Sequence, residues 1–219
     1  CAIYFVTQSK RMSANWAEEN LQTIRTLMER ASVYRRALAP VSMAAGGMGL
    51  IAAGVAEVTG WTADSHFAFY WLAVAFLTGA AALGLVRRQA LQAGEEFWSP
   101  PARRVARALL PMFMAGLGLG VLEVMTPVAS RDSIRLVAFW MILYGGALHS
   151  AGFFMRRGLK LLGCAYVLGG LGILALKLFM TSVDWTTVEP HWLMAAAFGL
   201  GNLFYGIYLK ATAEPLETE

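Results

Sequence analysis

Long apolar stretches separated by short polar ones set the pattern of this chain. Six apolar runs of about 20 residues are each long enough, as a helix, to cross about 30 Å of hydrocarbon. They lie near residues 37–56, 67–86, 108–126, 136–155, 161–180 and 191–209. The connections are short, so the 219 residues hold no second folded domain beside these runs. The pattern predicts an all-α integral membrane protein with six transmembrane helices.

The polar and aromatic residues at the ends of the runs recur in a regular order. The first, third and fifth runs end near an ionisable residue, namely Glu57, Glu123 and Lys177. The other three runs begin with aromatic residues and end in a basic one, 17 or 18 residues after a tryptophan, in the pairs Trp71 and Arg88, Trp140 and Arg157, and Trp192 and Lys210. This recurrence predicts three consecutive helical hairpins, at 37–88, 106–157 and 158–210, related by a pseudo-threefold repeat.

Glycine accompanies the ionisable residues of the repeat. Gly54 and Gly120 each stand three residues before an acid, and Gly170 stands seven residues before Lys177. The richest version is the stretch from Ala115 to Pro127, which we place at the centre of the second hairpin. Small residues let transmembrane helices approach closely, so these glycines predict packing surfaces.

Residues 15–36 form the one substantial polar segment with helical periodicity. Trp16, Leu21, Ile24 and Met28 recur at spacings that give one apolar stripe, and Arg35 and Arg36 follow directly before the first run. The spacing predicts a cytoplasmic amphipathic helix at the membrane interface. Two interpretations stay open for it: contact with anionic lipid, or docking of a cytoplasmic partner.

The remaining segments are short. Residues 1–14 are expected to be disordered or a non-native extension, residues 89–105 a cytoplasmic loop, and residues 211–219 an acidic tail. Cys1 and Cys164 give neither a disulfide framework nor metal-ligand spacing.

Composition and charge agree with this picture. The hydrophobic fraction of 58% and charged fraction of 15% lie outside the usual range of soluble domains. Of the 18 Lys and Arg residues, all but Arg131, Arg135 and Lys177 fall on one predicted side. By the positive-inside rule we expect both termini on the cytoplasmic side of the membrane. The net charge of +4 reflects this bias and predicts no nucleic-acid partner.

Ionisable and polar residues inside the spans are the candidates for chemistry, because they are costly in lipid. Glu57, Glu123 and Lys177 are expected within about one turn of the outer interface, where they either snorkel to water or pair, or else converge as a ligand, ion or proton site. His149, Ser150 and Asn202 lie deeper and are expected to bond neighbouring helices. An outer metal site that includes His66 and His191 matches no established spacing. We therefore expect no metal, no cofactor and no catalytic residue.

The segment from Glu19 to Arg35, which reads ENLQTIRTLMERASVYR and leads into an Ala-Pro start of the first run, resembles an uncharacterised bacterial inner-membrane family. That resemblance implies six helices without an assigned activity. The order of hairpins is also similar to that of the HdeD-type membrane proteins. Neither resemblance implies catalytic residues.

Two functions follow from these observations. The first is a non-enzymatic structural or regulatory membrane module, whose partners are the bilayer and a cytoplasmic protein bound by the amphipathic helix. The second is a small transporter or ion-coupled permeability protein that uses Glu57, Glu123 and Lys177. The sequence leaves a homo-oligomer open.

Overall fold

The computed structural model of the chain describes residues 38–60, 64–92, 94, 97–154, 157–180 and 184–212. The amphipathic helix expected at 15–36 and the segment 1–14 lie outside these residues, as does most of the acidic tail. Within the described part the chain is helical and has no strand.

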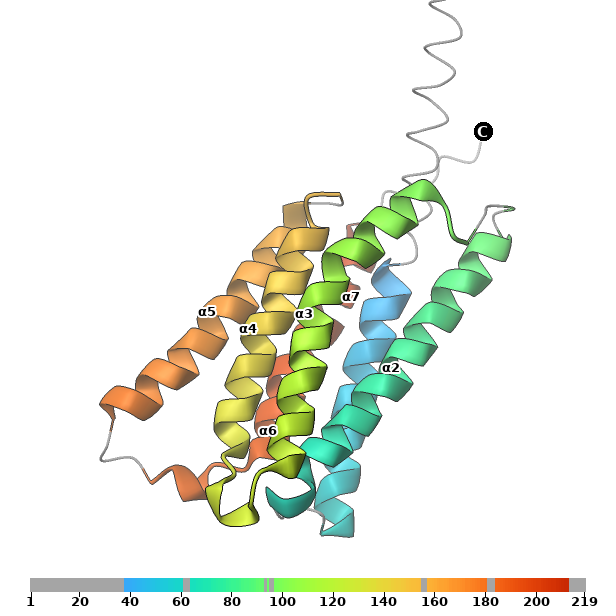
Figure 1. Cartoon of the computed structure of the whole chain (residues 1–219). Coiled ribbons are helices and arrows are strands. Elements are labelled where there is room, and N and C mark those ends of the chain that lie inside the picture. The colour runs from blue at the N-terminus through green and yellow to red at the C-terminus, as the bar shows by residue number, and fades with distance from the viewer. Residues whose placement is uncertain are drawn as a thin grey trace, which may run out of the picture.

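Six long helices lie side by side with roughly aligned axes (Figure 1). The first span is Leu38–Thr59, and the next four are α2 (Asp64–Gln92), α3 (Pro100–Met125), α4 (Ser133–Ala151) and α5 (Arg157–Phe179). The sixth span consists of α6 (Pro190–Met194), the π-helical stretch η3 (Ala195–Leu200) and α7 (Gly201–Ala211). Two short 3-10 turns, η1 (Val128–Ser130) and η2 (Trp185–Thr187), precede α4 and α6.

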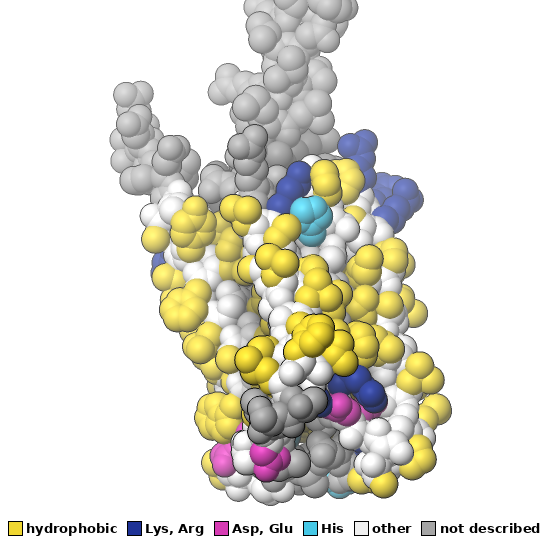
Figure 2. Space-filling model, turned by 90° about the vertical axis from the view of Figure 1, so that its left-hand side faces the viewer, with side chains coloured by type: hydrophobic (Ala, Val, Ile, Leu, Met, Phe, Trp, Pro, Cys, Tyr) yellow, Lys and Arg dark blue, Asp and Glu magenta, His cyan; other side chains and the backbone are white. Residues whose placement is uncertain are grey.

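All six helices are long and apolar enough to cross a membrane. Many of their large hydrophobic side chains are exposed, and they cover much of the surface in Figure 2. A soluble protein rarely shows so much contiguous apolar surface, whereas lipid is a suitable solvent for it. The prediction of an all-α chain with six helices long and apolar enough to span a membrane is confirmed in the described residues.

Proline positions explain the shape of α3. Pro100 and Pro101 occupy its first positions, where a missing N–H costs nothing. Pro111 lies inside the helix, removes one backbone hydrogen bond and accounts for the bend that α3 shows in Figure 1.

Glycine pairs bring two pairs of helices into backbone contact. A Cβ atom on Gly46 of the first span would lie 2.5 Å from the backbone nitrogen of Leu203 and 2.6 Å from the carbonyl oxygen of Gly199, in the sixth span. Between α4 and α5, a Cβ on Gly145 would lie 2.5 Å from the carbonyl oxygen of Gly163. Real Cβ contacts are never this short, so only glycine permits these helix separations.

These contacts join helices that the repeat assigns to different hairpins. Among the labelled helices, α4 and α5 share the most extensive interface, and they belong to the second and third predicted hairpins. The three tryptophans that the repeat places in register also differ in surroundings: Trp71 is buried, Trp140 is half-buried and Trp192 is 52% exposed.

The glycine-rich stretch of α3 packs against an aromatic side chain of α4. The Trp140 indole Nε1 donates a hydrogen bond to the carbonyl oxygen of Gly116, at 2.9 Å. Gly120 is buried against Trp140 and Leu72, whereas a Cβ on Gly118 would meet no atom within 4 Å. Two of these three glycines therefore serve helix packing, as the sequence predicts.

Candidate functional site

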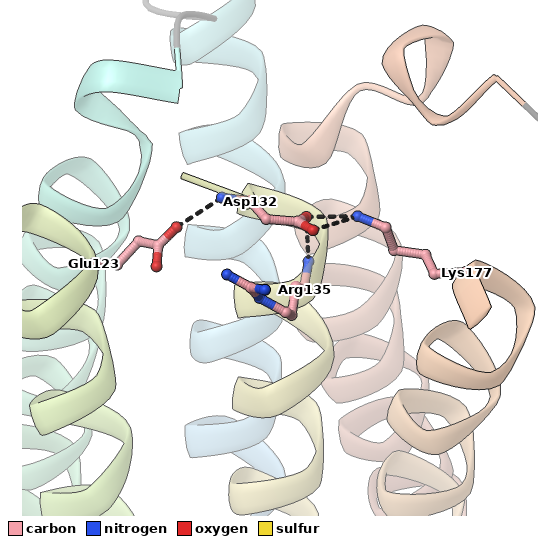
Figure 3. A network of polar contacts seen from close by, with 4 residues as sticks. All are labelled: Glu123, Asp132, Arg135 and Lys177. Carbon is pink, nitrogen blue, oxygen red and sulfur yellow. Dashed lines mark hydrogen bonds and ion pairs between the residues drawn. The ribbon is translucent and has the colours of Figure 1, made fainter. Parts of the chain in front are cut away.

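A polar network lies at the end of the bundle where α3 and α5 end and α4 begins (Figure 3). The network consists of Glu123, Asp132, Arg135 and Lys177. Lys177 Nζ lies 2.6 Å from each carboxylate oxygen of Asp132. The backbone N–H of Asp132 donates to Glu123 Oε1 at 2.8 Å. Asp132 therefore connects Glu123 of α3 to Lys177 of α5.

Asp132 is held in place by the start of α4. It is the N-cap residue of this helix, and its Oδ1 accepts a hydrogen bond of 3.0 Å from the backbone N–H of Arg135. Aspartate is favoured at this position because it satisfies a free N–H of the first turn and its negative charge complements the helix dipole. Lys177 stands in the last turn of α5, where a positive charge is favoured for the same reason.

Arg131 fixes the turn that leads from α3 into the network. Its guanidinium donates to the carbonyl oxygens of Val124, at 2.6 Å, and Thr126, at 2.9 Å. The last carbonyls of a helix have no intrahelical donor, so Arg131 satisfies groups that lipid could not. The turn between α3 and α4 is thus bonded to both helices.

The ion pair is partly open to solvent. The side chains of Lys177 and Asp132 are 23% and 28% exposed. Burial by itself raises the pKa of Asp132, but the hydrogen bonds from Lys177 and from the Arg135 N–H, with the charges of both residues, lower it further than burial raises it. The net result is a pKa below the ordinary value, so Asp132 is ionised at neutral pH and the pair is formed.

The structure brings two of the three predicted ionisable residues to one place and leaves the third apart. Glu123 and Lys177 share Asp132 as a partner, and Asp132 rather than Glu123 provides the carboxylate that contacts Lys177. Glu57 is exposed in the last turn of the first span and is not part of the network. Asp132 was not a candidate because it lies between apolar runs. Its position three residues before Arg135, at the start of a run, is the N-cap signal that could have identified it.

His149 contacts α5, the neighbouring helix. Its Nδ1 lies 3.4 Å from both Cys164 Sγ and the carbonyl oxygen of Lys160. The Lys160 ammonium sits 3.7 Å from the centre of the Phe153 ring. Ser150 is half-buried beside His149 on α4. The contacts of His149 are those expected of a polar residue that bonds a neighbouring helix.

Asn202 is buried among polar groups of three spans. Its Oδ1 accepts from the Tyr144 hydroxyl at 2.7 Å, and its Nδ2 donates to the Phe198 carbonyl at 2.8 Å and to the Tyr166 hydroxyl at 3.2 Å. The Tyr166 hydroxyl donates to the Ala197 carbonyl at 2.7 Å. The sequence identified Asn202 but neither tyrosine, because a tyrosine in an apolar run looks like any other aromatic residue.

His191 is buried, with 1% of its surface exposed, although the sequence placed it at the interface. Its Nδ1 accepts from the Trp71 indole at 3.1 Å, and the rings of Phe67 and Tyr70 pack against it edge-on. Among the residues that the structure describes, no three His, Cys, Asp or Glu side chains lie close enough together to hold a metal ion.

Comparison of the chain with protein-family models, curated proteins and solved structures found no match. The class of protein therefore rests on the six apolar helices, which are those of a polytopic helical membrane protein.

Proposed function

We propose that the chain is a non-enzymatic inner-membrane protein with a structural or regulatory role, and that the amphipathic segment 15–36 docks lipid or a cytoplasmic partner. Both termini are cytoplasmic in this proposal, because the arginines of α2 and of the first turns of α3 lie at the end opposite the polar network. We also propose that the six helices form three consecutive hairpins, and that the chain belongs to the uncharacterised bacterial inner-membrane family that residues 19–35 resemble.

The observation that carries the proposal is the use made of Glu123 and Lys177. Both residues were candidates for moving an ion or a proton, and both are bonded to Asp132 at the start of α4. These bonds tie the ends of α3 and α5 to one turn. Charged groups that bond one another in this way stabilise the bundle. The spans then have a structural role, and we place the docking function in the segments outside them.

The second candidate is a small transporter or ion-coupled permeability protein that uses Glu57, Glu123 and Lys177. It is favoured by the partial exposure of the Lys177–Asp132 pair and the exposure of Glu57, which give water access to these groups. Its weakness is that Glu57 does not join the other two.

Flux measurements distinguish the two candidates. The purified full chain is reconstituted into liposomes, and proton and monovalent-cation flux are followed with a pH-sensitive dye and a potential-sensitive dye. The proposal predicts the same flux as protein-free liposomes, for the natural chain and for E123Q. Flux that needs the protein and is abolished by E123Q would establish the transporter instead.

The docking role needs its own measurement on the full chain. In nanodiscs, hydrogen exchange of residues 15–36 is compared in neutral lipid and in lipid with phosphatidylglycerol. We expect slower exchange with the anionic lipid, and loss of this effect when Leu21, Ile24 and Met28 are all replaced by serine. E123Q is the matched control, and it should behave like the natural chain. Equal exchange of residues 15–36 in the two lipids, with no difference between the natural chain and the triple variant, would refute docking to lipid.

A further inference from the structure

The sixth span changes helical register within the membrane. It begins as the α-helix α6, continues as the π-helical stretch η3 from Ala195 to Leu200, and returns to α-helix in α7. The backbone N–H of Gly201 points to the carbonyls of both Ala196 and Ala197, which are its five-residue and four-residue acceptors. The two registers therefore meet at Gly201. π-Helical turns are rare and are found frequently at functional sites.

One side chain from α5 and one from α7 of the same span bond carbonyls near this junction. The Tyr166 hydroxyl of α5 bonds the Ala197 carbonyl, and Asn202 Nδ2 bonds the Phe198 carbonyl. Tyr144 of α4 fixes Asn202 by donating to its Oδ1. We call Tyr144, Tyr166 and Asn202 the register lock. A Cβ on Gly201 would lie 2.5 Å from the Tyr166 hydroxyl, so a glycine at the junction is what lets this hydroxyl reach the backbone.

The π stretch also lies against the first span. A Cβ on Gly49 would be 3.2 Å from the Cα of Gly199, and the carbonyl of Gly199 faces Gly46. One turn earlier in the sixth span, His191 is bonded to Trp71 of α2. A change of register at η3 therefore affects contacts with two other spans.

The size of that change follows from helix geometry. When the π stretch becomes α-helical, the segment Pro190–Met194 shifts by one residue relative to α7. One residue of α-helix corresponds to about 1.5 Å of translation and about 100° of rotation. The shift would turn Ala195, which is buried, away from its present neighbours and would break the bond between His191 and Trp71.

We propose that the sixth span is a two-register switch in which the register lock holds the π form. Opening the lock lets η3 become α-helical and moves the turn that carries His191. Gly199 transmits the change to the first span, whose other end continues from the segment 15–36. The switch thus connects the end that carries the polar network to the opposite end of the bundle. It does not depend on the proposed docking function.

The experiment measures hydrogen exchange of the full chain in nanodiscs for Y166F, with Y208F as the matched control. Tyr208 lies on α7 and is exposed, and the substitution removes the same atom. We expect Y166F to speed the exchange of amides 191–200 about fivefold, the factor that corresponds to one net hydrogen bond. Exchange in α3 to α5 of Y166F, and in every helix of Y208F, should not change.

A thiol reports the register directly. With Cys1 and Cys164 replaced by serine, A195C should react slowly with a membrane-permeable maleimide and about fivefold faster when Y166F is added. Y144F, which leaves the bond of Tyr166 in place, provides a milder variant if Y166F folds poorly. Unchanged exchange of amides 191–200 in Y166F and Y144F would overturn the proposal. So would an equal increase in all six helices, since Tyr166 would then be a general stabilising contact.

Discussion

Two adjacent glycines of the first span offer the sharpest test of the packing. Gly46 faces the backbone of the sixth span, whereas a Cβ on Gly47 would meet no atom within 4 Å. In G46A the new Cβ would lie 2.5 Å from a backbone nitrogen, so the two helices have to separate by about 1 Å to reach ordinary contact distance. Backbone cannot turn aside as a side chain can, and overpacking of this kind costs about 1–3 kcal/mol.

G47A is the control for the higher helix propensity of alanine. Alanine is favoured over glycine in a helix by up to about 1 kcal/mol, and this gain is common to G46A and G47A. Their free energies of unfolding should therefore differ by about 1–3 kcal/mol, with G46A the less stable.

The assay is equilibrium unfolding in mixed micelles at increasing mole fraction of dodecyl sulfate, followed by tryptophan fluorescence. G47A should match or exceed the stability of the natural chain. Equal stability of G46A and G47A would refute the inferred backbone contact between the first and sixth spans.

Two further predictions use the same assay. D132N removes the ion pair with Lys177 and should lower the free energy of unfolding by about 1 kcal/mol at pH 7, the upper range for partly exposed pairs. Because the pKa of Asp132 is lowered in the folded state, its contribution to stability is present above about pH 4 and is lost as pH falls through the folded pKa. D132N should therefore lack this part of the acid transition, and an unaltered acid transition would contradict the pairing. W140F removes the donor to the Gly116 carbonyl and should lower the free energy of unfolding by about 0.6 kcal/mol. W192F, which changes an exposed indole, should lower it by less, and the reverse order would exclude the hydrogen bond.

The sequence determined the helices of this protein almost completely. A helix in lipid satisfies its backbone hydrogen bonds within one segment, so a long apolar run is enough to predict it. The predicted run 161–180 corresponds to the span Gly158–Phe179, and the predicted run 108–126 to most of α3. The ends were less accurate, because α2 continues as a helix past Arg88 to Gln92.

The sequence identified part of the candidate site. Charged residues stand out in apolar runs, and Glu123 and Lys177 were found in this way. Asp132 was not, because the N-cap signal of an aspartate marks the start of a helix but does not show that Glu123 and Lys177 will lie beside it. Its role arises from two helix ends that come together around a third.

Only the tertiary structure decided which faces of the helices meet. Hydropathy gives the length of a span but not its rotation, which is set by side-chain packing against neighbours. Gly46 and Gly47 are the same residue type one position apart, yet one touches backbone and the other meets nothing. The π register at Ala195–Leu200 has the same origin, since the Tyr166 hydroxyl, 31 residues away in the sequence, bonds the Ala197 carbonyl, and the Tyr144 hydroxyl, 58 residues away, holds Asn202. Local interactions formed the helices, and long-range contacts between them fixed the register.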